Sequence, residues 1–136
     1  MSTLLTTTQV RDSFADTLDR AGRGLPVGID RRLGVIALLP AGRLAEALRS
    51  STLVPRPELF CEEGVWVASI PDAPVAAEAG DMEAAIDELV EALREFADDW
   101  SARLHTAPNH ARWWALVQMV SFSTDEQLKN WVTRTG

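Results

Sequence analysis

Two adjacent arginines, Arg31 and Arg32, lie between two short apolar runs, in a chain of 136 residues whose formal net charge is -7. The runs Pro26–Ile29 and Gly34–Leu39 have the length of strands, and residues 30–33 between them predict a hairpin turn. A tight turn directs both guanidinium groups outward. Such groups bind phosphate oxygens and can read guanine edges, so this turn could contact a nucleic acid.

Hydroxyl groups and further arginines flank the helix that precedes this hairpin. Thr6 and Gln9 fit a capping box at its start, and Thr8 and Arg11 would add to an anion site there. One copy offers few contacts, so useful affinity would require a dimer. The residues alone leave open a second interpretation, in which these arginines are surface groups paired with Asp12, Asp16 and Asp30.

Enzyme chemistry has little support in the sequence. His105 and His110 are the only histidines, and their spacing of five across Pro108 does not place them on one helical face for a metal. Cys61 lies beside two acids, which disfavours a thiolate nucleophile. We expect no enzyme, metal site or cofactor. A metal-dependent enzyme using His105, His110 and Cys61 is the alternative that bound metal would support.

The charge is distributed unevenly along the chain. Residues 1–50 hold seven arginines and five acids, whereas residues 51–136 hold six basic and 15 acidic residues, a balance of +2 against -9. The first part could meet a polyanion, and the second could meet a cationic protein. An ordinary acidic protein without specialised halves would show similar numbers, so charge alone leaves both readings open.

The periodicity of the chain indicates a small soluble α+β protein, and the following features indicate the cytoplasm. Hydrophobic residues make up 46% and charged residues 24%. No apolar stretch approaches the 18 residues of a membrane span, so we expect no membrane partner. The N-terminus lacks the pattern of a signal peptide, and the single Cys61 cannot form an internal disulfide.

Regular elements can be predicted along the whole chain. In the first part we expect a strand at Thr3–Leu5, a helix with Val10, Phe14, Leu18 and Ala21 on one face, the hairpin, and a helix over Ala41–Ser50. Two prolines in residues 51–57 predict a linker. Strands at Leu59–Cys61, Val65–Ile70 and Val75–Ala79 should follow.

The clearest element is an amphipathic helix that begins at Met82 after the N-cap Asp81. Its apolar positions recur at steps of three and four, and acids that include Glu88, Glu91 and Glu95 fill the other face. Two further helices are predicted after Pro108 and from Asp125. Adjacent tryptophans on a helix point about 100° apart. Either one of Trp113 and Trp114 therefore lies at a partner interface, or the helix is buried on two sides. Trp131 could likewise lie in the core or at an interface.

Residues 5–48 resemble the N-terminal domain of prevent-host-death (Phd/YefM) antitoxins. The segment LTTTQVRDSFADTLDRA resembles that family's opening helix, and GLPVGIDRRLGVIALLPAGRLAEAL resembles its hairpin and second helix. Leu33 departs from the pattern, where the family usually has glycine. The resemblance implies a β-α-β-β-α domain over residues 1–50 that forms a homodimer and binds operator DNA through Thr6, Thr8, Arg11, Arg23, Arg31 and Arg32.

Residues 64–96 are similar to the core of HicB-type antitoxins, in which Ile-Pro-Asp, Gly-Asp and an acidic amphipathic helix follow one another. That family's final strand is missing here, because residues 107–135 indicate helices. The resemblance implies that residues 58–136, a small sheet plus helices, bind and neutralise a toxin. The partner contacts expected from the acidic helix and the tryptophans are Glu88, Glu91, Glu95, Trp113, Trp114 and Trp131.

Together the two resemblances imply an antitoxin of a type II toxin–antitoxin system. It would neutralise a basic toxin, typically a ribonuclease, by direct binding and would repress its own operon through operator DNA. The alternative is a Phd-like dimeric transcriptional regulator, or a structural dimer, without a toxin partner.

Overall fold

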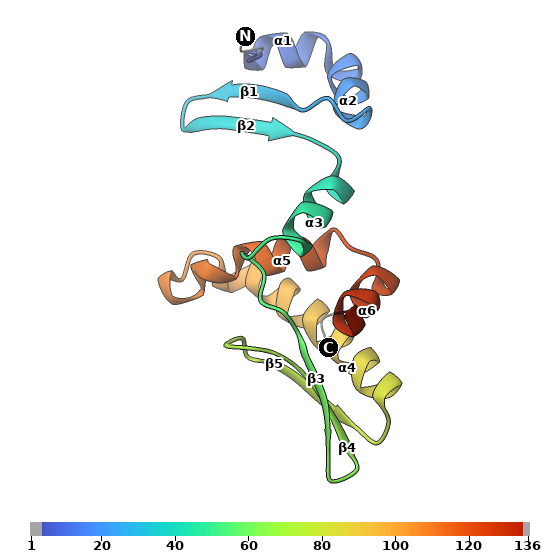
Figure 1. Ribbon diagram of the computed structural model, residues 1–136. Helices are drawn as coiled ribbons and strands as arrows, with labels where there is room; N and C mark the ends of the chain where they lie inside the picture. Colours follow the sequence, from blue (N-terminus) through green and yellow to red (C-terminus); the bar gives the residue numbers. More distant parts are fainter. Residues whose placement is uncertain (1–3, 135–136) are drawn as a thin grey trace. The chain divides into compact units, whose positions relative to one another are not determined.

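The computed structural model describes residues 4–134 and is mixed α+β (Figure 1). The chain divides into two compact units, Met1–Leu44 and Ala45–Gly136. The division falls within helix α3 (Ala41–Arg49), upstream of the irregular residues 51–57 that were expected to form a linker. The formal charges of the two units, +2 and -9, equal those of the two sequence halves. That residues 1–50 and 58–136 act as separate functional domains stays a prediction.

The first unit contains the predicted hairpin. Strands β1 (Val27–Arg31) and β2 (Gly34–Leu38) pair in antiparallel fashion. Arg31 is the last residue of β1 and pairs with Gly34, so the turn consists of Arg32 and Leu33 alone. Gly34 has a φ of +142°, a conformation that residues with a side chain rarely adopt. The turn is therefore two residues tighter than the sequence predicts.

The helix before the hairpin is two helices, α1 (Thr7–Asp12) and α2 (Phe14–Gly22), and the prediction of one continuous helix is wrong. They are separated at Ser13, which has φ -130° and ψ 42°. The Ser13 hydroxyl donates to the carbonyl oxygen of Gln9 at 2.7 Å. A serine hydroxyl that donates to the carbonyl four residues earlier competes with helical geometry, which accounts for the break.

The start of the chain partly matches the strand predicted at Thr3–Leu5. Thr3 lies outside the described residues. Leu5 forms a single parallel bridge with Ile29, in which its amide donates to Gly28 O at 2.9 Å. An added Cβ at Gly28 would lie 2.6 Å from Leu4 Cδ2, so glycine at this position allows residues 4–5 to approach β1.

The second unit contains a three-stranded antiparallel sheet in the order β3-β4-β5. Its strands are β3 (Glu58–Glu62), β4 (Val65–Ile70) and β5 (Val75–Ala79), within one residue of the prediction. Glu63 and Gly64 form the first turn with φ of 51° and 80°. Two successive positive φ values suit the twist of a two-residue hairpin.

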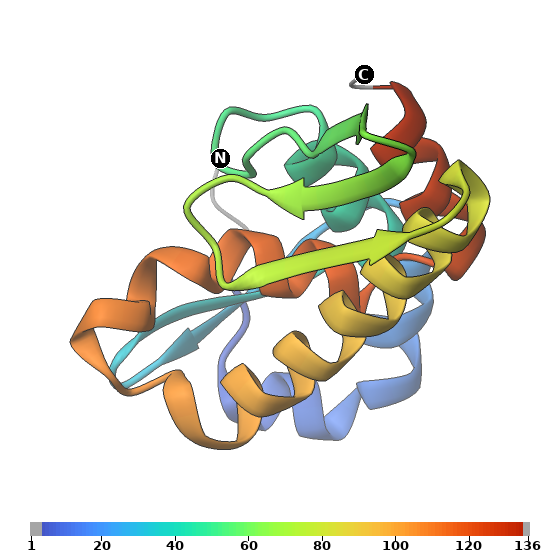
Figure 2. The same ribbon diagram turned by 90° about the horizontal axis from the view of Figure 1, so that it is seen from below.

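Helix α4 (Met82–Asp99) lies along this sheet, as Figures 1 and 2 show. Asp81 accepts a hydrogen bond from the Ala84 amide at 2.8 Å, which confirms the predicted N-cap. A π-helical turn, Trp100–Leu104, extends α4. The predicted inward face is buried at Ile86, Leu89 and Leu93, but Met82 is 42% exposed because it lies on the first turn.

Two helices complete the second unit and pack against α4. The helix predicted after Pro108 begins as a 3₁₀ segment, Pro108–Trp113, and becomes α5 at Trp114–Ser121. Helix α6 (Asp125–Arg134) begins at the predicted residue. Leu89, Leu93, Leu116, Met119 and Leu128 are almost inaccessible and form the core. No helix in residues 4–134 has both the length and the apolar character that crossing a membrane requires.

The first unit has little core of its own. Within its described residues, Ala21 and Val27 are the hydrophobic residues that are buried. Phe14 and Leu18, which the sequence places on one helical face with Val10 and Ala21, are 56% and 45% exposed. Two of the four apolar residues of this face are therefore largely exposed.

Candidate functional site

The turn residues Arg31 and Arg32, here called the arginine turn, are both exposed. The Arg31 guanidinium donates from Nη1 to Thr7 Oγ1 at 3.3 Å, which holds it beside the first residue of α1. Neither arginine takes part in the ion pairs found among residues 4–134. Both therefore keep donor groups for an anionic ligand.

The start of α1 has the predicted capping box. Thr6 Oγ1 accepts from the Gln9 amide at 3.1 Å, and Gln9 Oε1 accepts from the Thr6 amide at 2.8 Å. The Thr6 hydroxyl keeps its own hydrogen to donate, and Thr8 is exposed on the same turn. Arg11 lies 4.0 Å from Asp12, with both side chains more than 70% exposed. Such a pair holds an arginine only weakly.

The predicted DNA contacts are not all at one place. Thr7 and Arg31 are in contact, and Thr6, Thr8 and Arg32 are their neighbours in sequence. Arg23 follows α2 and precedes β1, whereas the arginine turn lies at the far end of β1. A five-residue strand extends roughly 13 Å between its first and last Cα atoms. Sequence reasoning missed Thr7, whose place as the first helical residue could have indicated it.

The exposed side of α4 borders a shallow pocket of about 460 Å³ with α6, here called the acidic groove. Two of the predicted partner contacts, Glu91 and Glu95, line it, and so does Asp98. Glu88 is exposed on α4 but does not line this groove. Steps of three and seven residues place Glu88 on the same helical face as Glu91 and Glu95, but beyond the edge of the groove.

Two ion pairs tie α6 to α4 at this groove. Arg94 Nη2 lies 2.8 Å from Asp125 Oδ1, and Lys129 Nζ lies 2.9 Å from Asp87 Oδ1. The hydrogen bond that Lys129 donates to Asp87, followed by the negative charge of Asp87, raises the pKa of Lys129. In the described chain, Glu91, Glu95 and Asp98 have no ion-pair partner, so their charges remain available to a cationic ligand.

The three tryptophans predicted as partner contacts have different surroundings. Trp113 is 5% exposed and packs edge-to-face on Phe96, with ring centroids 6.5 Å apart. Trp131 is 7% exposed, whereas Trp114 is 50% exposed. Neighbouring indoles on one helix therefore have opposite environments. Only Trp114 presents a large surface to a partner, and its contact with one stays a prediction.

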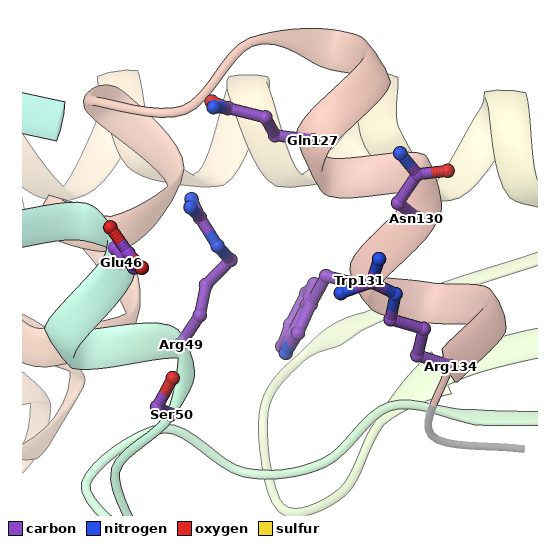
Figure 3. Close-up of a pocket in the computed structure, with 7 residues that line it drawn as sticks. All are labelled: Glu46, Arg49, Ser50, Gln127, Asn130, Trp131 and Arg134. Carbon is purple, nitrogen blue, oxygen red and sulfur yellow. The ribbon is translucent and has the colours of Figure 1, made fainter.

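A groove that the sequence did not indicate lies between α3 and α6 in the second unit (Figure 3). Its volume is about 530 Å³, and an adjoining pocket of about 610 Å³ shares Arg49, Ser50, Trp131 and Arg134 with it. Arg56 lines the adjoining pocket. We call the two together the cationic groove.

The residues considered for a metal do not converge. Cys61 is exposed on β3, and the His110 carbonyl accepts from Trp100 Nε1 at 2.8 Å. Within residues 4–134, no three His, Cys, Asp or Glu side chains lie close enough together to hold a metal ion.

Comparison with known proteins gives one family and one fold. A PHD-like family model, described as antitoxin of toxin–antitoxin, RelE/RelB, TA system, matches residues 1–133. A crystal structure described as the antitoxin part of a proposed toxin–antitoxin system from Syntrophomonas wolfei subsp. wolfei is similar, with a TM-score of 0.79 and 21% identity over 96% of each chain. At that identity the likeness shows the fold alone. No curated protein matches the sequence.

Proposed function

The chain belongs to the PHD-like family of antitoxins of RelE/RelB toxin–antitoxin systems, and we propose that it divides its work between its two units. The first unit would form a homodimer and bind operator DNA, so that the protein represses its own operon. The second would bind and neutralise the cognate toxin directly. A Phd/YefM-type first unit and a HicB-like second unit are part of this proposal.

The observation that supports the proposal most strongly is that the two compact units of the structure carry formal charges of opposite sign. The compact unit Met1–Leu44 has a formal charge of +2, and Ala45–Gly136 has a charge of -9. A duplex is attracted to the former and repelled by the latter, while a basic protein has the opposite preference. Two ligands of opposite charge can therefore occupy one chain without competing.

DNA binding is assigned to the arginine turn and the start of α1. Arg31 and Arg32 are exposed and outside the described ion pairs, and Arg31 is held against Thr7. Exposed arginines without a carboxylate partner can contact phosphate oxygens or base edges. Thr6, Thr8 and Arg11 would add phosphate contacts on the same side. Arg23, at the other end of β1, would contact a different phosphate.

Dimerisation is assigned to the apolar surface of the first unit. Val35 and Ile36 are neighbours on β2 and are 56% and 52% exposed, although successive strand residues point to opposite faces. Both faces of the hairpin are thus open at these positions. An isolated two-stranded sheet is marginally stable. A second copy of the chain would bury the exposed apolar side chains of the hairpin, together with Phe14 and Leu18.

Toxin binding is assigned to the acidic groove. Glu91, Glu95 and Asp98 are uncompensated charges on a rigid helix. A ribonuclease needs a basic surface to hold RNA, and that surface would complement these carboxylates. The exposed Trp114 would add an apolar anchor on the same unit.

Coexpression tests this proposal. The full chain, carrying an affinity tag, is produced together with the protein encoded next to it in its operon. A stoichiometric complex that inhibits the partner's RNA cleavage supports the proposal. A homodimer recovered alone, beside a neighbour that is not toxic, would instead favour a dimeric regulator without a toxin.

A further inference from the structure

Basic residues are scarce in the second unit, and their placement is uneven. Residues 45–136 hold seven basic and 16 acidic residues. Four of the seven are engaged: Arg94, Arg103 and Lys129 in ion pairs with carboxylates, and Arg112 over the Trp113 ring at 4.5 Å. The remaining three, Arg49, Arg56 and Arg134, all line the cationic groove.

These three arginines come from separate parts of the chain. Arg49 ends α3, Arg56 lies in the irregular segment before β3, and Arg134 ends α6. None of them forms an ion pair with a carboxylate of the described residues. Glu46 lies at one end of the groove and leaves the lining with an excess of positive charge. Like charges that gather without compensation favour an anionic occupant.

Arg49 is held in place within the groove. Its Nη1 donates to Ser123 Oγ at 2.6 Å, and Ser123 is buried and donates in turn to Met119 O at 2.6 Å. The guanidinium keeps further N–H groups for a second acceptor. An arginine fixed by one contact loses less entropy when it binds a carboxylate.

Trp131 forms a wall of the groove between Arg49 and Arg134 (Figure 3). Only 7% of this residue is exposed, so little of its ring is available for stacking. Recognition of a nucleic-acid base on an aromatic face needs an open ring. The groove is therefore better suited to an anionic group than to a base.

We propose that the cationic groove binds a short acidic segment of a partner protein. The unit's charge of -9 would repel a nucleic-acid strand, whereas a few carboxylates can be held locally by arginine forks. Two adjoining pockets suit an extended peptide. The amides of Gln127 and Asn130 and the hydroxyls of Ser50 and Thr52 can bond its backbone. This inference goes beyond the proposed toxin and DNA contacts and depends on neither.

A peptide titration tests the inference. The full chain is titrated into fluorescein-labelled hexaglutamate, and anisotropy is read at 50 and 500 mM salt. We expect saturable binding at low salt that weakens at high salt. The variant R56Q/R134Q should bind about two- to thirtyfold more weakly, since it loses two exposed arginine–carboxylate contacts. R20Q/R43Q, with the same change of charge at exposed positions of the first unit, should bind like wild type.

Three results would overturn the inference. They are the absence of binding at low salt, equal binding by wild type and R56Q/R134Q, and displacement of the peptide by inorganic phosphate or AMP at lower concentrations than by unlabelled hexaglutamate. The last result would assign the groove to phosphate. Circular dichroism verifies folding, and the single variants R56Q and R134Q, both at exposed positions, decide the matter if the double variant unfolds.

Discussion

Arg31 donates a hydrogen bond of 3.3 Å to Thr7, 24 positions earlier in the chain. This contact joins the tip of the hairpin to the start of α1, so two features that could each bind phosphate lie on one surface. Neither residue is buried. The proposed DNA site depends on this proximity more than on the number of arginines in the unit.

Replacing both arginines of the turn should weaken operator binding. In R31A/R32A, the slope of log affinity against log salt should flatten by about one unit per lost phosphate contact. Fluorescence anisotropy with operator DNA at several salt concentrations measures it. The matched double variant R56A/R134A removes two arginines from the second unit and should leave the slope unchanged. An unaltered slope in R31A/R32A would remove the turn from the DNA site.

Neutralising the acidic groove should weaken toxin binding. E91Q/E95Q removes two charges without shortening the side chains, and its affinity for the toxin should fall by roughly five- to thirtyfold, mostly at low salt. Calorimetry at two salt concentrations measures this. Glu88 lies outside the groove, so E88Q should have a smaller effect. If E88Q were the more damaging change, the toxin contact would lie outside the acidic groove.

Charging the hairpin should weaken the proposed dimer. V35E and I36E place a carboxylate on opposite faces of β2, and the variant on the interface face should raise the dimer dissociation constant at least about tenfold, since burial of one such side chain stabilises by about 1.5–3 kcal/mol. Sedimentation velocity measures this. L53E alters a similarly exposed residue of the second unit and serves as the control. If both variants had the dimer dissociation constant of the wild type, dimerisation through this hairpin would be excluded.

Removing the N-cap of α4 should destabilise the second unit. D81A loses the 2.8 Å hydrogen bond to the Ala84 amide, which should lower the free energy of unfolding by about 1 kcal/mol. Urea denaturation followed by tryptophan fluorescence reports it. D98A removes an exposed acid near the other end of α4 and should cost less. An equal loss in both variants would mean that charge, and not capping, is responsible.

A cavity in the core should cost more than the loss of the cap. Leu89 is fully buried between α4 and its neighbours, so L89A should lower the free energy of unfolding by about 2–5 kcal/mol. M82A, at a position 42% exposed on the same helix, should change it little. If L89A and M82A lowered the free energy of unfolding by similar amounts, the burial of Leu89 and the exposure of Met82 on α4 would be contradicted.

The regular elements of the second unit were predictable because local chemistry defines them. Gly80 and Asp81 end one element and cap the next, and spacing by three and four residues marks the buried face of α4. In the first unit, the break at Ser13 was not predictable, because a side-chain hydrogen bond to Gln9 outweighs a continuous apolar pattern.

Site residues were less predictable than elements. Composition marks acids and arginines, but the gathering of Arg49, Arg56 and Arg134 around Trp131 arises only from tertiary packing. The different burial of Trp113 and Trp114 agrees with neighbours that point about 100° apart, but the sequence did not indicate which of the two is buried.

The division of labour between the units is tested most directly by measuring R31A/R32A and E91Q/E95Q against both operator DNA and purified toxin. We predict that the first variant loses affinity for DNA and keeps its affinity for toxin, and that the second does the reverse. Loss of both activities in either folded variant would contradict separate binding surfaces on the two units.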